Sequence, residues 1–220
     1  MQGRRDRWRR RCSLVSVLLP TMRPDSWRRS FDSIEAACGD VPYEVIVVAS
    51  FSTNELLEHC WWMVRERLCV VDALIRAEEL ARGEYLFSFN DQSVLAPEAL
   101  ERLYHEAESR PGELLTPRHE PAYRFVYYDR IFAPFPFAHR NLLVRLGGIA
   151  DRAYRSFYSD PDLSMRAHDN GVSVRVVDDA IIYHANVHDH AHQQNVSAHH
   201  LADREAFVKR WAHYGVFVEC

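Results

Sequence analysis

Apolar and polar positions form two kinds of pattern along the first half of the chain. Short continuous apolar runs bounded by turn residues predict strands that are buried on both faces of a sheet. Segments with apolar residues at helical spacing predict helices between these strands. The predicted strands cover residues 13–19, 43–49, 69–71 and 84–89. The predicted helices cover residues 25–37, 55–67, 73–82 and 97–109. This alternation is typical of an α/β fold with a mostly parallel central sheet flanked by helices.

The second half of the chain has a different texture. Residues 111–146 are rich in Pro, Phe, Tyr and Arg and contain short strand-like pieces such as 124–128. The pair Gly147-Gly148 predicts a loop. We then expect a helix at 160–170, strands at 172–177 and 180–183, and a final amphipathic helix at 202–214. No internal repeat or long linker interrupts the chain, so we predict one domain over residues 13–220 after a basic flexible tail, residues 1–12.

Composition excludes several classes of protein. Apolar residues make up 47% of the chain, which is enough to build a core and rules out wholesale disorder. A net charge of −4 argues against a generally basic nucleic-acid binder, so we expect no nucleic-acid partner. No apolar run approaches the length that spans a bilayer. The five scattered cysteines include no C-x-x-C pair, which argues against a disulfide framework and a structural zinc site.

Positive charge is concentrated at the N-terminus. Residues 1–11 hold six arginines against one aspartate. This tail could tether the chain to anionic lipid or nucleic acid, or it could be a solvated extension. The apolar run that follows, residues 14–19, is too short for a signal peptide and is not followed by a small-residue cleavage site. We therefore expect a cytoplasmic protein, with peripheral contact at the inner face of the membrane as a role open to the tail.

Polar residues follow three of the predicted strands. They are Pro20-Thr21-Met22-Arg23 after the first strand, Ser50 after the second and Asn90-Asp91-Gln92 after the fourth. In an open α/β sheet ligands bind beyond the carboxyl ends of the strands, so these residues are candidates for a binding site. The chain has no G-x-G-x-x-G and no G-x-x-x-x-G-K-[ST] motif, which argues against a standard dinucleotide site and a P-loop. Bound phosphates would need a metal ion or arginines as counter-charge.

Five stretches of the chain resemble a known family in their order and spacing. They are V-S-V-L-L-P-T-M-R-P (15–24), Y-E-V-I-V-V-A-S (43–50), A-R-G-E-Y-L-F-S-F-N-D-Q (81–92), L-G-G (146–148), and Y-S-D-P-D-L-S-M-R (158–166) with D-D-A-I-I-Y-H (178–184). Together they make the chain similar to family 2 glycosyltransferases, from about residue 14 to residue 184. The resemblance implies a GT-A type nucleotide-diphospho-sugar transferase fold. It also implies a nucleotide-binding half at 13–110 and an acceptor-binding half at 111–220.

The family resemblance implies a reaction and a catalytic residue. A sugar would pass, with inversion, from a nucleoside-diphosphate sugar to a hydroxyl acceptor, expected to be a saccharide of a cell-surface glycan. Asp160 matches the general base that takes the proton of the acceptor hydroxyl, although it could also be the N-cap of the predicted helix. Gly147 and Gly148 resemble the acceptor-side loop, without the aromatic and acidic residues that usually follow directly. Asp162 is expected to bind the acceptor or to be structural.

The family resemblance also implies a donor site. Its expected residues are Pro20, Thr21, Arg23, Ser50, Asn90, Asp91 and Gln92, with Thr21, Arg23 and Ser50 at the nucleoside end. A divalent metal ion, Mn²⁺ or Mg²⁺, is expected at Asp91, Gln92 and His184. Relatives usually carry carboxylates at the positions of Asn90, Gln92 or both, and neutral amides bind such ions more weakly.

These donor residues also have structural interpretations. Asn90 and Gln92 could be plain turn residues, and His184 a polar residue at a strand end. Leu74-Ile75 stands where many relatives have an Arg-Asn pair that touches the nucleotide. The amides at positions 90 and 92 and the apolar pair at 74–75 both depart from the family pattern at the donor side.

Residues 184–200 contain a dense set of histidines. They are His184, His188, His190, His192, His199 and His200. A zinc site, a mobile loop that closes over the donor and an ordinary surface loop are the three interpretations. Recognised zinc motifs place Cys or Glu among the histidines, and that spacing is absent here.

Two other functions fit parts of the sequence. A degenerate GT-A domain that binds a nucleotide sugar or a partner without transfer would explain the missing carboxylates at positions 90 and 92. A nucleotidyltransferase would share the type of sheet, but it normally has a glycine-rich loop after the first strand, and residues 20–24 contain no glycine. We therefore predict a glycosyltransferase, with the degenerate domain as the alternative.

Overall fold

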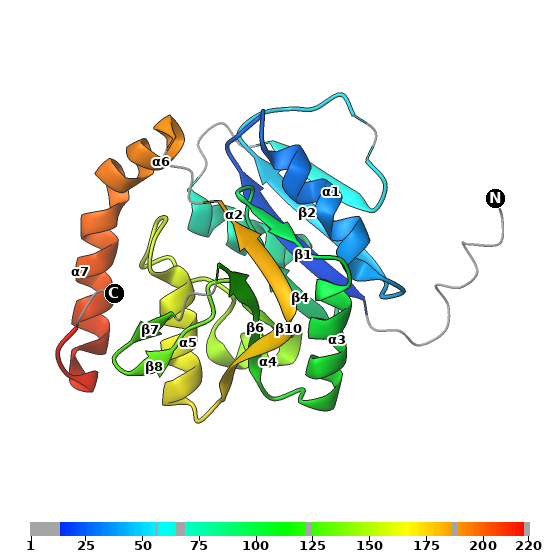
Figure 1. The fold of residues 1–220 in the computed structure, drawn as a ribbon. Helices are drawn as coiled ribbons and strands as arrows, with labels where there is room; N and C mark the ends of the chain where they lie inside the picture. The colour runs from blue at the N-terminus through cyan, green and yellow to red at the C-terminus, as the bar shows by residue number, and fades with distance from the viewer. Residues whose placement is uncertain (1–13, 56, 65–68, 122–124, 186–188, 218–220) are drawn as a thin grey trace.

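The computed structural model describes residues 14–55, 57–64, 69–121, 125–185 and 189–217, and within them an eight-stranded sheet forms the centre of the molecule (Figure 1). Its order is β3-β2-β1-β4-β9-β6-β10-β5. The strands are β1 Val15–Thr21, β2 Tyr43–Ala49, β3 Cys60–Val64, β4 Tyr85–Ser88, β5 Ser93–Leu95, β6 Leu114–Glu120, β9 Phe137–His139 and β10 Val174–His184. A two-stranded hairpin consists of β7 Val126–Tyr127 and β8 Arg130–Ile131. The predicted basic tail, residues 1–12, lies outside the described residues.

The sheet is parallel in its first half and mixed in its second. β1 pairs in parallel with β2 and β4, and β2 pairs in parallel with β3. β10 is parallel to β6, whereas β9 runs antiparallel to β4 and β6, and β5 antiparallel to β10. Pro20 belongs to β1, although the sequence predicts that this strand stops there. β4 pairs with β1 only as far as Leu18, so the missing N–H of Pro20 removes no hydrogen bond from that pair.

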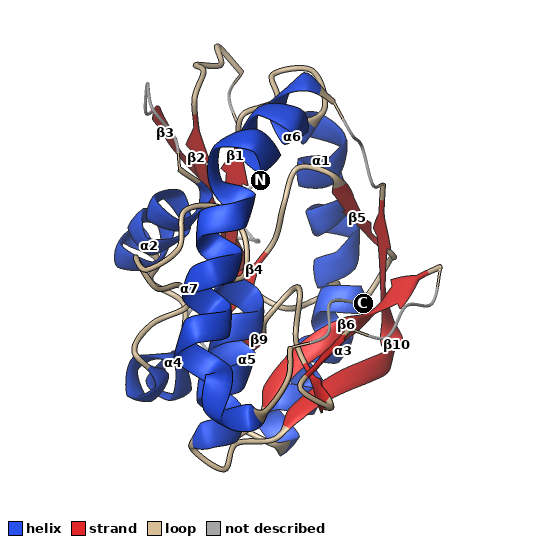
Figure 2. Cartoon of the chain, turned by 90° about the vertical axis from the view of Figure 1, so that its left-hand side faces the viewer, coloured by secondary structure: helices blue, strands red, loops and turns tan. Residues whose placement is uncertain are grey.

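Helices cover both faces of the sheet. They are α1 Trp27–Cys38, α2 Val70–Leu80, α3 Ala99–Ser109, α4 Arg140–Leu146, α5 Ser159–Asp169, α6 His190–Asn195 and α7 Leu201–Trp211. α1 and α3 pack on one face, and α2, α4 and α5 pack on the other. Figure 2 shows α7 running alongside α5, with α6 beyond its N-terminal end. These positions confirm the predicted α/β class with helices on both sides of the sheet.

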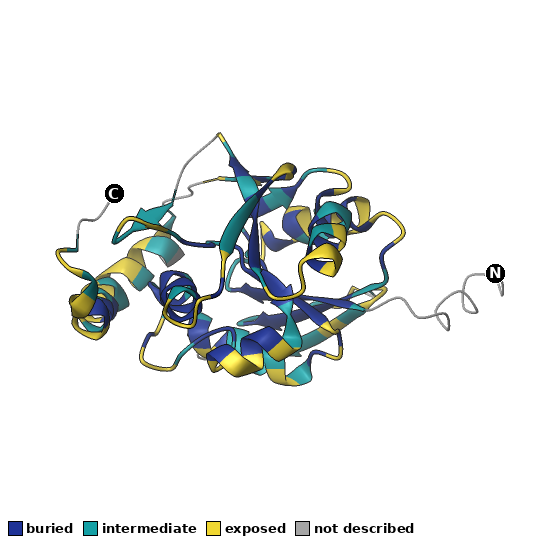
Figure 3. Cartoon of the chain, turned by 90° about the horizontal axis from the view of Figure 1, so that it is seen from below, coloured by how far each residue is buried: buried dark blue, intermediate teal, exposed yellow. Residues whose placement is uncertain are grey.

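The two cores follow the twofold alternation of side chains along the strands. Val15, Val17 and Leu19 face the core under α1 and α3, whereas Leu18 faces the core under α2, α4 and α5. Figure 3 shows buried residues along the strands and exposed residues on the outer faces of the helices. Each fully buried aliphatic side chain contributes about 1.5–3 kcal/mol, so both faces stabilise the sheet that positions the site.

Two predictions for residues 55–71 are wrong. The helix expected at 55–67 is replaced by an edge strand, β3, which pairs with β2 from Cys60 to Val64. Trp62 of this strand packs edge-on against Trp27 of α1, with ring centroids 4.8 Å apart, so tertiary packing overrides the helical spacing. The strand expected at 69–71 is the beginning of α2, whose N-cap is Cys69.

Other boundaries also differ from the prediction. The strands expected at 172–177 and 180–183 are one strand, β10, with an irregularity between Val177 and Ile181. α4 lies where only strand-like pieces were expected. The histidine-rich segment is not a loop from residue 190 onward, because α6 continues through a π-helical turn, Val196–His200, into α7. A 3₁₀ turn, Ala212–Tyr214, ends the predicted final helix. In the described part of the chain, every helix is too short or too polar to cross a bilayer.

Candidate functional site

A cavity of about 720 Å³ opens at the carboxyl ends of β1 and β4. β1 and the turn after it contribute Pro20, Thr21 and Arg23, and the turn after β4 contributes residues 90–92. The other walls come from the first turns of α2 and α5, the ends of β6 and β10, and α6. This is where an open α/β sheet binds its ligands, and the volume is in the range of sites for small molecules.

Most of the residues predicted to bind the donor line this cavity. They are Pro20, Thr21, Arg23, Asn90, Asp91, Gln92 and His184. The structure brings Asp160 to the same cavity from α5. Ser50 is not among the residues that line it; its backbone N–H donates to the carbonyl oxygen of Thr21, at 3.2 Å, and extends the pairing of β1 with β2.

Asp91 is held in a tight polar corner where β4 ends. Asp91 is 5% exposed, and both of its carboxylate oxygens accept hydrogen bonds. The Thr21 hydroxyl donates to Oδ2 at 2.7 Å, and Nη1 of Arg23 donates to Oδ1 at 2.8 Å. The Asn90 side-chain oxygen accepts from the N–H of Gln92 and the hydroxyl of Ser93, which fixes the turn that presents Asp91. The turn interpretation of Asn90 therefore agrees with its contacts.

Arg23 connects this corner to the segment that begins α6. Its Nε and Nη2 donate to the two oxygens of Asp189, at 2.6 and 3.2 Å. Burial alone would lower the pKa of Arg23, but the hydrogen bonds and charges of Asp189 and Asp91 outweigh burial and raise it. The same hydrogen bonds from Arg23 lower the pKa of Asp189 to about 2. Both groups are therefore charged at neutral pH.

His184 lies at the end of β10 beside Asn90. Its Nδ1 is 2.8 Å from the hydroxyl of Ser93, which itself donates to Asn90. Because a hydroxyl has one hydrogen to give, Nδ1 of His184 is the donor in this contact and Nε2 carries the lone pair. Burial, together with the charges of His119 and Arg23, lowers the pKa of His184 to about 4. The imidazole is therefore neutral at pH 7.

Asp160 is in a different environment, on the first turn of α5. The N-cap of this helix is Tyr158, so the interpretation of Asp160 as the N-cap is wrong; it is the second residue of the helix. Its side chain reaches solvent through the cavity, although protein surrounds it on most sides. Removal from bulk water raises the pKa of the Asp160 carboxyl to about 7, and its own backbone N–H offsets this only in part. A carboxylate with this pKa can accept a proton near neutral pH.

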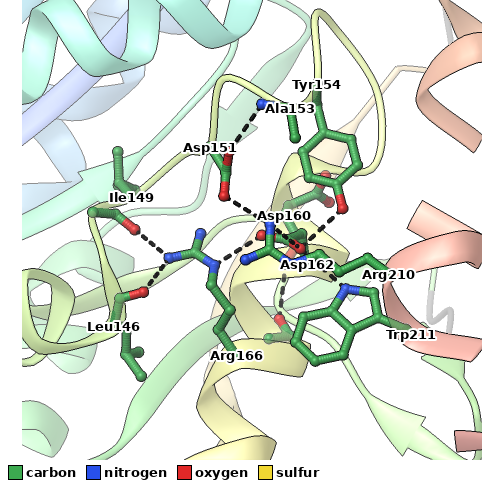
Figure 4. A network of polar contacts seen from close by, with 12 residues as sticks. Leu146, Ile149, Asp151, Ala153, Tyr154, Asp160, Asp162, Arg166, Arg210 and Trp211 are labelled. Atoms are coloured by element: carbon green, nitrogen blue, oxygen red, sulfur yellow. Dashed lines mark hydrogen bonds and ion pairs between the residues drawn. The ribbon is translucent and has the colours of Figure 1, made fainter. Parts of the chain in front are cut away.

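Asp162 lies behind Asp160 and is fully buried (Figure 4). Its oxygens accept from Tyr154, Arg166 and Trp211 at 2.8–3.0 Å, and Arg210 forms an ion pair with it at 3.3 Å. Asp162 does not line the cavity; it pairs with Arg166 within α5, and its other side-chain contacts join α5 to α7 and to the loop before α5. This arrangement agrees with the structural role among its two expected roles.

Gly147 and Gly148 also lie outside the lining of the cavity. Both have positive φ angles, +92° and +99°, which L side chains rarely adopt. Arg166 donates to the carbonyl oxygens of Leu146 and Gly148, and the turn brings Ile149 into the wall of the cavity. The glycine pair therefore shapes the wall of the cavity through Ile149 and not by direct contact with the cavity.

Asp203 of α7 organises the loop that leads to Asp160. This carboxylate is 2% exposed and accepts from three consecutive backbone N–H groups, those of Arg155, Ser156 and Phe157, at 2.8–3.1 Å. Ser156 and Phe157 both line the cavity. The sequence pattern contains no signal for this contact, because it joins residues far apart along the chain.

The side chains that line the cavity do not form a carboxylate-rich metal centre. The described residues include no group of three or more His, Cys, Asp or Glu side chains that could hold a metal ion. Thr21 and Arg23 already occupy both oxygens of Asp91, and the positive charge of Arg23 lies where a metal ion would have to approach. Gln92 adds only a neutral amide. The expected set of Asp91, Gln92 and His184 is thus poorly suited to Mn²⁺ or Mg²⁺.

Neither a model of a protein family nor a curated protein matches the sequence. Among solved structures, the chain is similar to the crystal structure of GalNAc-T7 with UDP, GalNAc and Mn²⁺, with a TM-score of 0.61 and 13% sequence identity. The match covers 80% of this chain and 44% of that one, so the chain spans less than half the length of this structural relative. The fold is of the GT-A type. At this identity the likeness shows the fold alone, and membership of family 2 stays a prediction.

Proposed function

We propose that the protein is a glycosyltransferase that moves a sugar from a nucleoside-diphosphate sugar to a hydroxyl acceptor with inversion. The observation that carries this proposal is the presence of Asp91 and Asp160 in one cavity of a GT-A fold. The structural relative was crystallised with UDP and GalNAc, which supports a nucleotide-sugar donor and a saccharide acceptor. Asp91 and Arg23 mark the donor side, and Asp160 marks the acceptor side.

The proposed reaction is a single displacement at the anomeric carbon. The acceptor oxygen attacks this carbon from the face opposite the diphosphate while Asp160 takes the hydroxyl proton. The bond from the anomeric carbon to the diphosphate oxygen breaks, and its electron pair leaves with the diphosphate. With a pKa of about 7, Asp160 is basic enough to accept the proton and still largely ionised slightly above neutral pH.

The test is the variant Asp160→Asn, assayed with UDP-, GDP- and dTDP-sugars and a panel of saccharide acceptors. We expect the transfer rate to fall by about 10²–10⁴-fold, the usual contribution of a general base, while nucleotide binding by calorimetry is spared. The matched control is Asp169→Asn, at the exposed far end of the same helix, which should keep the wild-type rate. A full rate in Asp160→Asn would remove the base from the proposal.

A second candidate function is a degenerate GT-A domain that binds a nucleotide sugar or a partner without transfer. The observation that favours it is the apolar side chain of Leu74 in the wall of the cavity, where relatives have a polar contact to the nucleotide. Nucleotide-sugar binding with neither hydrolysis nor transfer, over the whole acceptor panel, would favour this candidate.

The remaining proposals concern organisation and location. We propose that residues 13–110 bind the nucleotide and residues 111–220 the acceptor, within one domain, and that the acceptor is a saccharide of a cell-surface glycan. We also propose a cytoplasmic location, with peripheral contact at the membrane through the basic tail. Fractionation of the full chain and of a chain lacking residues 1–12 tests the role of the tail.

A further inference from the structure

Arg23 has an unusual position among the residues of the cavity. It is the only arginine or lysine among the described residues that line it. The other charged groups near its guanidinium are two carboxylates, Asp91 at 2.8 Å and Asp189 at 2.6 Å. A diphosphate that enters the cavity therefore meets one cation, and that cation is already paired twice.

The two carboxylates around Arg23 are held differently. Asp91 is 5% exposed and is also bound by the buried hydroxyl of Thr21, so it is part of the wall. The Asp189 side chain is 32% exposed, and apart from Arg23 its described partner is the backbone N–H of His192. Nε and Nη2 of Arg23 each donate to a different oxygen of Asp189, and a guanidinium can bind two phosphate oxygens in the same two-point way. Asp189 therefore has the geometry of an anionic ligand that can be displaced.

Charge balance argues that displacement is needed. Arg23 with two ionised carboxylates carries a net charge of −1, so the group as it stands repels an anion. When Asp189 leaves, Arg23 and Asp91 together are neutral, and Nε and Nη2 of Arg23 become available to phosphate oxygens. Among the described residues around Asp91, no cluster of carboxylates could hold a metal ion that would bridge to the diphosphate instead.

We propose that Arg23 binds the diphosphate in the role that a divalent metal ion has in many nucleotide-dependent enzymes, and that Asp189 competes with the diphosphate for it. This inference rests on the proposed function for the identity of the diphosphate group, but the anion site itself can be tested separately. Asp189 then sets the affinity of the site, because each binding event has to break its ion pair with Arg23.

Calorimetry tests the inference. The ligands are inorganic pyrophosphate, UDP, GDP and dTDP, each measured in EDTA, and the three nucleotides are then measured again in Mn²⁺. We expect wild-type protein to bind pyrophosphate and one nucleotide in EDTA. Arg23→Ala should weaken both by about 30-fold or more, because charge-assisted hydrogen bonds are lost. Asp189→Asn should strengthen both by about tenfold, because the competing charge is removed while Asn still caps α6.

Two further variants keep the test independent of folding. Arg23→Lys retains the charge but loses the planar donor pair, so we expect binding between that of the wild type and that of Arg23→Ala. Asp32→Asn, which removes an exposed carboxylate paired with Arg28 far along α1, is the control for Asp189→Asn and should leave binding unchanged. Circular dichroism and the thermal midpoint verify that each variant is folded.

Each other outcome has a defined meaning. Nucleotide binding that needs Mn²⁺ and is equal in wild type and Arg23→Ala overturns the inference and leaves the proposed function standing. Unchanged affinity in Asp189→Asn overturns the competition. If pyrophosphate binds but no nucleotide or nucleotide sugar does, the anion site stands and the proposed nucleotide-sugar donor is overturned. Absence of binding by every probe, with and without Mn²⁺, overturns both proposals.

Discussion

The two carboxylates of the cavity, Asp91 and Asp160, have opposite surroundings. Asp91 is buried beside a hydroxyl and a guanidinium, which donate hydrogen bonds to its two carboxylate oxygens. No ion pair reaches Asp160 from the residues that the structure describes, and burial raises its pKa to about 7. The same type of side chain is thus held by two donors in one corner, whereas in the other corner its pKa lies near neutral pH. The surrounding groups, and not the residue type, therefore distinguish the two carboxylates.

The largest effect is expected from Asp162→Ala, which breaks the support of the Asp160 corner. The substitution leaves Arg166, with an 8% exposed side chain, without its carboxylate and removes the acceptor of Tyr154 and Trp211. Loss of one partner of a buried ion pair costs about 3–5 kcal/mol. Urea denaturation followed by tryptophan fluorescence measures the free energy of unfolding.

The matched control is Asp169→Ala on the same helix, whose carboxylate is 52% exposed and contacts Tyr214 and His213. Its cost should stay below about 1 kcal/mol. Equal losses in the two variants would mean that the buried network does not hold the helix.

The next largest effect is expected in the pH dependence of transfer. Because Asp160 must be ionised to accept the proton, kcat/KM should rise about tenfold per pH unit below its pKa and level off above about 7. The rate at pH 5 should be about 100-fold below the plateau. In Asp160→Asn the residual rate should no longer rise with pH between pH 5 and 7. A rise that remains in the variant would assign the titration to another group.

A third prediction compares Asp→Asn at the two positions through stability. The folded pKa of Asp160 lies above its ordinary value of 3.8, so protonated Asp160 is the form that the fold favours. Its contribution to stability is fully present below about pH 4 and is lost as pH rises through about 7. Asp160→Asn should therefore be more stable than wild type at pH 8 and no more stable at pH 4. Thermal midpoints across this range check the sign, and a difference that does not grow with pH would contradict it.

The smallest effect is expected from Asp91→Asn, and its sign is opposite. Asn keeps an acceptor for Thr21 but removes the charge that faces Arg23, so we expect a loss of about 1 kcal/mol at pH 7. Urea denaturation alongside Asp160→Asn measures both. A gain of stability in both variants would mean that the two corners do not differ in the way their contacts indicate.

The sequence predicts the parts of the fold that depend on local pattern. The continuous apolar runs of β1, β2 and β4 and the periodic helices α1, α3 and α5 are where the pattern places them, within a few residues. The pattern also brings Asp91 and Thr21 together, because the carboxyl ends of adjacent parallel strands meet at one edge.

Features that depend on distant contacts are the ones the pattern does not predict. β3 is a strand because it pairs with β2 and packs Trp62 against α1. The local sequence of β3 does not indicate that it will contact either element. The residues of α6 are too polar for helical periodicity to stand out. Asp189 has no signal beyond its charge, since its role depends on Arg23, which lies at the other end of the chain. α4 is the exception, because Leu142, Leu143 and Leu146 are at helical spacing and could have indicated it.

The hydrogen bonds of Asp203 have a consequence for the order of events during synthesis. The parallel strands and the turn with Asp91 can form while the ribosome is still making the second half of the chain. The loop before Asp160 cannot settle then, because its three backbone N–H groups find their acceptor only on α7. The nascent protein therefore settles the strands and the turn around Asp91 early, and the loop before Asp160 only after α7 has left the exit tunnel.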